Sequence, residues 1–132
     1  MSKAWYPRAK RVTYHRSPNG QSMGGEQGAK HVTVHAEGVH RSAPSAQSLA
    51  NFFNSPAGSG PYHFLFVAHG PNAGDIVQML PADRGAFSVG GYAHKTPGGF
   101  SLNRYGKRHI QICVVGVKES PSWGKMSKKA KK

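Results

Sequence analysis

The apolar residues of this chain fall in a few short runs, and this constrains its fold more than any other feature. The runs cover residues 31–36, 62–68, 76–80 and 109–117. Each has the length and the β-branched or aromatic content typical of a strand. Nearly all of the 17 Gly and 9 Pro lie outside these runs. A chain of 132 residues with 37% hydrophobic content is therefore expected to form one small, loop-rich domain.

One amphipathic segment, residues 42–54, separates the first two predicted strands. Either Ser42 or Ala43 precedes Pro44, a residue suited to the first turn of a helix. Apolar side chains then recur at helical spacing at Ala46, Leu49, Ala50 and Phe53. This segment predicts a helix that ends in the turn beginning at residue 54.

The order of these elements indicates an α/β protein with a mixed central β-sheet and flanking helices. Residues 69–75 have turn composition, so strands 62–68 and 76–80 are expected to form a hairpin. Residues 81–107 are rich in Gly and Pro and predict a long surface loop. The last run is apolar at successive positions, which predicts a strand in the middle of the sheet.

Basic residues far outnumber acidic residues and concentrate at the two ends of the chain. The net charge is +13, from 18 basic and 5 acidic residues. We divide the chain into a basic N-terminal extension (1–29), a folded domain (30–123) and a basic C-terminal tail (124–132). Trp5-Tyr6-Pro7 is expected to dock on the domain, and Ser17 to Gly28 to remain loop. This charge favours polyanionic partners, which include nucleic acid and bacterial wall polymers.

The cysteine count and the length of the apolar stretches limit the kinds of site and the location that this chain can have. The single cysteine, Cys113, excludes an internal disulfide and a multi-cysteine metal site, and its apolar neighbours predict a small buried side chain. No apolar stretch is long enough to span a membrane, and the N-terminus lacks the apolar core of a signal peptide. These features predict a protein made and kept in a cytoplasm unless another agent releases it.

Polar side chains at the strand ends are the candidates for chemistry. His35 comes at the carboxyl end of the first predicted strand, where open α/β sheets place their sites. It is either a metal ligand or a polar residue bonded to backbone. Tyr62 is either a groove residue or a core aromatic with a solvated hydroxyl. His63 points to the opposite face from Tyr62, so it is expected to be structural.

These motifs, in this order, resemble the zinc-dependent N-acetylmuramoyl-L-alanine amidases, which include phage endolysins and relatives of the peptidoglycan recognition proteins. The likeness runs from residue 5 to 123. It is carried by the segments Val32-Thr33-Val34-His35-Ala36-Glu37-Gly38, Gly60-Pro61-Tyr62-His63-Phe64, Ile76-Val77-Gln78-Met79-Leu80-Pro81, Ser88-Val89-Gly90-Gly91-Tyr92-Ala93-His94, Asn103 and Ile110-Gln111-Ile112-Cys113-Val114-Val115-Gly116.

The resemblance implies a zinc site at the strand ends and a hydrolytic reaction on peptidoglycan. His35 matches the first zinc ligand, and Tyr62 and Glu37 match positions that assist catalysis. His94 and Asn103 match positions that contact substrate. In such a site, zinc polarises the lactyl-amide carbonyl between muramic acid and the stem peptide and activates a water molecule.

The chain departs from the family pattern after the last strand. The remaining zinc ligands of the family, a His and then an Asp or Cys, follow a long C-terminal helix, whereas Glu119 is the only acid here after Val117 and no His or Cys follows. The resemblance thus implies a C-terminally shortened fold.

Three functions remain open from the sequence. The first is an amidase domain completed by a missing C-terminal part or by a second chain, acting on the wall after release from a host cytoplasm. The second is a non-catalytic binding or structural protein on the same fold, such as a virion component. The third is a small basic protein that binds nucleic acid through its termini.

Overall fold

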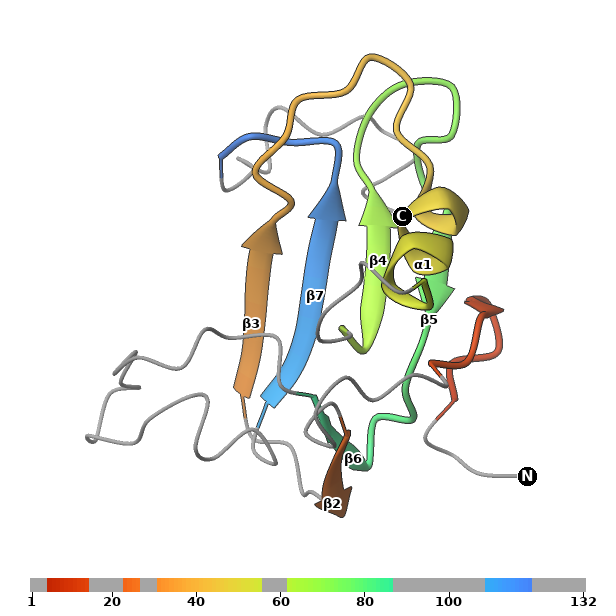
Figure 1. Cartoon of the computed structure of the whole chain (residues 1–132), viewed down its shortest axis with the longest axis vertical. Coiled ribbons are helices and arrows are strands. Elements are labelled where there is room, and N and C mark those ends of the chain that lie inside the picture. The colour runs from red at the N-terminus through yellow and green to blue at the C-terminus, as the bar shows by residue number, and fades with distance from the viewer. Residues whose placement is uncertain (1–4, 15–22, 27–30, 56–61, 87–108, 120–132) are drawn as a thin grey trace.

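The computed structural model describes residues 5–14, 23–26, 31–55, 62–86 and 109–119. These residues form one helix and seven strands (Figure 1). In chain order they are β1 (Lys10–Arg11), β2 (Met23–Glu26), β3 (His31–Ala36), α1 (Ala46–Phe53), β4 (Phe64–Val67), β5 (Ile76–Gln78), β6 (Arg84–Ala86) and β7 (His109–Val115).

Five of these strands form a mixed sheet in the order β1-β5-β4-β7-β3. β7 runs parallel to both β3 and β4, whereas β4 and β5 are antiparallel. The predicted hairpin and the inner position of the last strand are therefore confirmed. A mixed sheet with a helix also confirms the α/β class. The carboxyl ends of β3, β7 and β4 meet at one end of the sheet (Figure 1).

The helix α1 begins later than the sequence predicts. Ser45 is its N-cap, in an extended conformation, and its hydroxyl accepts a hydrogen bond from the backbone N–H of Ser48 at 3.3 Å. Pro44 thus precedes the cap and does not lie in the first turn. The expectation of a start at Ser42 or Ala43 was wrong because the Ser45 hydroxyl can satisfy a free N–H of the first turn.

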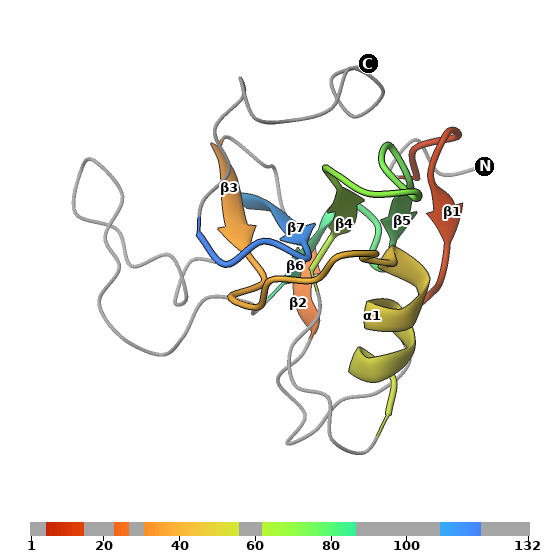
Figure 2. The same ribbon diagram turned by 90° about the horizontal axis from the view of Figure 1, so that it is seen from above.

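α1 lies on one face of the sheet, over β4 and β5 (Figure 2). Its apolar side chains Ala46, Leu49 and Ala50 are buried there. Strand residues complete the core: Leu65, Val67, Val77, Met79, Cys113 and Val115. Cys113 is 1% exposed, which confirms its prediction as a buried side chain. Because α1 stops short of β3, that part of the same face is less covered.

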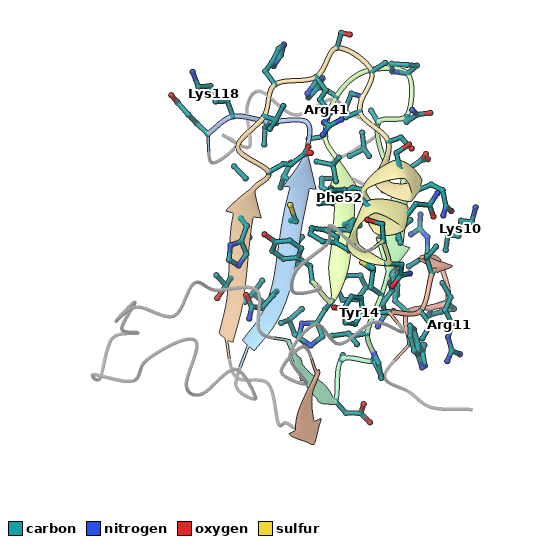
Figure 3. All side chains as sticks on the ribbon, in the orientation of Figure 1. Lys10, Arg11, Tyr14, Arg41, Phe52 and Lys118 are labelled. Atoms are coloured by element: carbon teal, nitrogen blue, oxygen red, sulfur yellow. The ribbon has the colours of Figure 1, made fainter. Side chains whose placement is uncertain are left out.

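The N-terminal segment contributes to the sheet and the core, which its sequence did not indicate. β1 pairs in parallel with β5, and the N–H of Tyr14 donates to Met79 O at 2.9 Å. Tyr14 is only 2% exposed and packs in the core (labelled in Figure 3). Tyr6 docks as expected: its N–H donates to Gln78 Oε1 at 2.7 Å, and its ring meets Phe64 edge to face.

Two further strands correct the predicted loops. β2 lies in the segment 17–28 and β6 in the segment 81–107, and the two pair antiparallel. Neither segment has the alternating apolar pattern that predicts a strand. Both strands are short and are held by backbone hydrogen bonds to each other. No helix in the part of the chain described here is long and apolar enough to cross a membrane.

Candidate functional site

His35 lies on the edge strand β3, on the face of the sheet that carries α1. The register pairs His35 with Cys113 and Thr33 with Gln111, so side chains of β3 and β7 share this face. His35 is half-buried because α1 covers β4 and β5 rather than β3. The structure thus places His35 near the end of β3, as the sequence predicts, with part of its ring accessible.

A buried glutamine holds the His35 ring. The Nε2–H of His35 donates to Gln111 Oε1 at 2.8 Å, and Gln111 is 1% exposed. The backbone N–H of Gln111 in turn donates to His63 Nδ1 at 2.9 Å. His63, directly before β4, is fully buried and hydrogen-bonded to β7, as expected of a structural residue. The bond to Gln111 keeps the proton on His35 Nε2, so a metal ion at His35 would have to bind Nδ1.

Tyr62 connects His35 to the helix through ring contacts. The Tyr62 and His35 centroids are 5.0 Å apart, edge to face, and Tyr62 meets Phe53 of α1 in the same way at 5.6 Å. An aromatic row thus runs across the sheet from α1 to β3. Edge-to-face contacts are favourable because the positive ring edge meets the negative ring face.

The Tyr62 hydroxyl and the Cys113 thiol both keep their protons because they are buried on this face of the sheet. Burial, reinforced by the neighbouring Cys113, raises the pKa of the Tyr62 hydroxyl above its ordinary value. Burial also raises the pKa of the Cys113 thiol to about 12, with a further contribution from the charge of Glu37. Both groups are therefore protonated at neutral pH. The Tyr62 hydroxyl donates its hydrogen bond to the Cys113 sulfur, so its proton is held within the fold and the residue does not act as a base at neutral pH.

Glu37 is held by partners of its own. Its Oε1 accepts from Arg41, at 3.0 Å from Nε and 2.8 Å from the terminal guanidinium nitrogen, and its Oε2 accepts from the N–H of Gly116 at 2.6 Å. Its side chain is 9% exposed. Arg41 is labelled at this end of the sheet in Figure 3. The carboxylate thus ties the residues after β3 to the end of β7.

The described residues do not make a zinc site of the expected kind. A zinc centre needs at least three protein ligands. No group of three His, Cys, Asp or Glu side chains within the described ranges could hold a metal ion. Cys113 is protonated and Glu37 is already paired, so His35 stands as a single ligand of the expected set. His94 and Asn103 lie outside the described residues.

Sequence reasoning missed Gln111 and Cys113 as neighbours of His35. Both lie 76 or more residues further along the chain. Their proximity follows from the parallel register of β3 and β7, which no local pattern encodes. The sequence held one sign of this contact, the polar residue Gln111 within the otherwise apolar run of β7, and its apolar neighbours made it easy to overlook.

A separate group of basic side chains lies near β1. Arg8 and Lys10 line a cavity of about 310 Å³ between β5 and the start of α1, together with Asp75. The Arg11 guanidinium lies 3.7 Å from the centre of the Trp5 ring, a cation–π contact. Lys10 and Arg11 are labelled in Figure 3. These exposed cations are remote from His35 across the sheet.

Comparison of the chain with protein-family models, curated proteins and solved structures found no match in any of the three. The likeness to the amidases therefore depends on the residues and their order alone.

Proposed function

We propose that this chain is a peptidoglycan-directed domain of the N-acetylmuramoyl-L-alanine amidase type, which binds the wall polymer at the surface beside His35 and Tyr62. The single observation that carries the proposal is the contact between these two rings on the half-covered part of the sheet. The resemblance assigns both residues to the site, and they come from segments that are separated by the helix in the sequence.

The chemistry of this surface suits a neutral, polar ligand. The Tyr62 and His35 rings offer an apolar floor, and Gln111 holds the polar His35 ring in a fixed orientation. Sugars and peptide amides combine polar edges with apolar faces, and such ligands are bound by aromatic side chains with a few fixed polar groups. The lactyl-amide region of peptidoglycan is a ligand of this kind.

Of the zinc ligands that the resemblance implies, the described residues supply His35, and one ligand is too few for the zinc-dependent reaction. Binding without hydrolysis, the second function inferred from the sequence, is favoured by one observation. Both oxygens of Glu37 are paired, with Arg41 and with the N–H of Gly116, so this carboxylate is already committed within the fold. Hydrolysis of the lactyl-amide bond would require ligands from elsewhere in this protein or from a second chain.

The test is a sedimentation assay with purified insoluble peptidoglycan, stripped of anionic polymers to remove charge-driven binding. The variant is His35→Ala. The matched control is Val34→Ala, on the same strand but on the opposite face and 50% exposed. We expect His35→Ala to weaken binding about tenfold, and Val34→Ala to leave it unchanged. Equal binding by the two variants, or no binding by wild type, would contradict the proposal.

Two added measurements separate the alternatives. Release of free amino groups from the same peptidoglycan, together with zinc content of the protein, distinguishes an amidase from a binding domain. Competition with duplex DNA at matched salt tests the nucleic-acid alternative, for which the exposed Arg8 and Lys10 are the relevant residues. Binding to DNA but not to stripped peptidoglycan would favour that alternative.

A further inference from the structure

Two histidines outside the His35 surface lie together at the carboxyl end of the sheet. The rings of His40 and His69 stack, with centroids 5.8 Å apart and planes inclined by 11°. His40 follows β3 and His69 follows β4, so the two come from loops that meet where these parallel strands end (Figure 1). Neither residue has a role in the proposed wall binding.

One ring nitrogen of His69 is already committed. His69 Nε2 lies 3.1 Å from the carbonyl oxygen of Gly116, an acceptor, so Nε2 carries the proton and donates. The lone pair of the neutral ring is then on Nδ1. Metal-binding histidines characteristically donate their other ring N–H to a carbonyl or carboxylate, which fixes the tautomer. His69 therefore has the arrangement of a metal ligand before any metal binds.

Hydrogen bonds hold the two loops against each other and against the end of β7. The side-chain amide of Asn72 donates to Pro44 O at 3.0 Å, and the backbone N–H of Arg41 donates to Gly116 O at 3.1 Å. Gly70 adopts a φ of +81°, and a Cβ there would lie 3.0 Å from Ser42 O. This close packing fixes the positions of the two loops, so the backbone needs little ordering when a ligand binds.

The spacing of the rings fits one shared ion. Two imidazoles on one zinc-sized ion have centroids at most about 6.5 Å apart, because each metal–nitrogen bond is about 2.0–2.1 Å. The observed 5.8 Å lies within this limit. The His40 ring must turn to direct a nitrogen at the ion, which its exposure permits, while His69 keeps its bond to Gly116 O. The nearby Arg41 guanidinium is paired with Glu37, which reduces its repulsion of a cation.

We propose that His40 and His69 form a two-histidine site for a late divalent transition metal ion such as Cu²⁺, Ni²⁺ or Zn²⁺, with water as the remaining ligands. Imidazole nitrogen is a preferred ligand of these ions, whereas Mg²⁺ and Ca²⁺ prefer oxygen. The site is independent of His35 and of peptidoglycan binding.

The experiment is titration of the full chain with Cu²⁺, followed by calorimetry and by electron paramagnetic resonance, which reports the number of bound nitrogens. The variants are His40→Ala and His69→Gln; the glutamine retains an N–H donor for Gly116 O. The matched control is Val39→Ala, an exposed neighbour of His40. Background binding by other histidines is common to all four proteins.

We expect each histidine variant to lose the same Cu²⁺ equivalent or to bind it at least about tenfold more weakly. The double variant should lose nothing further, and Val39→Ala should match wild type. Unchanged binding in His40→Ala would overturn the proposal, and this variant tests it even if His69→Gln destabilises the fold. His35→Ala should retain the site, so failure of the wall-binding proposal is separately visible.

Discussion

Two histidines that both contact Gln111, His63 and His35, have opposite environments. His63 lies between the inner strands, is fully buried, and accepts a hydrogen bond from the backbone of β7. His35 lies on the edge strand, is half-buried, and is bonded to a side chain. Both interact with the same residue, Gln111: His63 with its backbone and His35 with its amide.

The difference shows how position in a sheet separates structural from functional side chains. An inner strand has neighbours on both sides and a helix above it, so a polar group there must be satisfied within the fold. An edge strand that the helix does not reach leaves part of a side chain available to a ligand. The same residue type therefore serves stability in one place and recognition in the other.

The largest expected effect is at His63. His63→Ala should lower the free energy of unfolding by about 3–4 kcal/mol, because it leaves a cavity and an unsatisfied Gln111 N–H. Chemical denaturation measures this loss. His63→Asn, whose side-chain oxygen can replace Nδ1 as acceptor, should lose less. A loss below about 1 kcal/mol for the alanine variant would remove the contrast with His35, since surface substitutions are of that size.

Gln111 links the two histidines and should have an intermediate effect. Gln111→Leu retains the volume but removes the acceptor for His35 Nε2–H, so we expect a loss of about 1–2 kcal/mol. NMR of the His35 ring should also show a less restricted orientation. If the ring signals were unchanged, Gln111 would not be what holds His35.

His35 itself should matter little for stability. His35→Ala removes the partner of Gln111 Oε1 but opens that oxygen to water, so it should lower the free energy of unfolding by about 1 kcal/mol, well below the loss for His63→Ala. The same variant should lose binding to peptidoglycan. Comparable destabilisation by His35→Ala and His63→Ala in parallel denaturation experiments would show that both histidines are structural.

The smallest effect at neutral pH involves Cys113, which packs beneath the His35 surface. Its pKa is raised to about 12 in the folded chain, from an ordinary value near 9. Between these values the unfolded chain loses its thiol proton first, so the stability contributed by the protonated thiol is complete below pH 9 and is lost toward pH 12. Cys113→Ala should flatten this part of the stability profile.

Thiol labelling provides an independent measurement. A thiol that is 1% exposed and protonated should react slowly with an alkylating reagent at pH 8 and rapidly after denaturation. Fast labelling of the folded protein would show that the face between β3 and α1 is more open than the structure indicates.

Much of the fold could be predicted because hydrophobic runs encode strands locally. β3 occupies the predicted residues 31–36, and the hairpin and the inner strand follow from apolar content and turn composition. The short strands β1, β2 and β6 could not be predicted, because backbone pairing with distant residues holds them. The predicted helix start was wrong because both Ser42 and Ser45 are suitable N-caps, and only the backbone conformation shows that Ser45 is the cap.

The site was predictable only in part for the same reason. His35 and Tyr62 were identified from strand position and resemblance, and the structure brings their rings together. The partners of Glu37 could not be foreseen, because Gly116 N–H reaches it only through the parallel pairing of β3 and β7. The stacking of His40 on His69 likewise depends on two loops that are distant in sequence.

The sequence by itself determined four of the strand segments (β3, β4, β5 and β7), the α/β class, the basic charge and the identity of the polar residues at the strand ends, because periodicity and composition are local properties. Only the tertiary structure decided which of those residues meet. Strand order and register brought Gln111 beneath His35, joined Glu37 to Gly116 and paired His40 with His69. These contacts depend on long-range strand pairing and helix placement, which a local pattern does not specify.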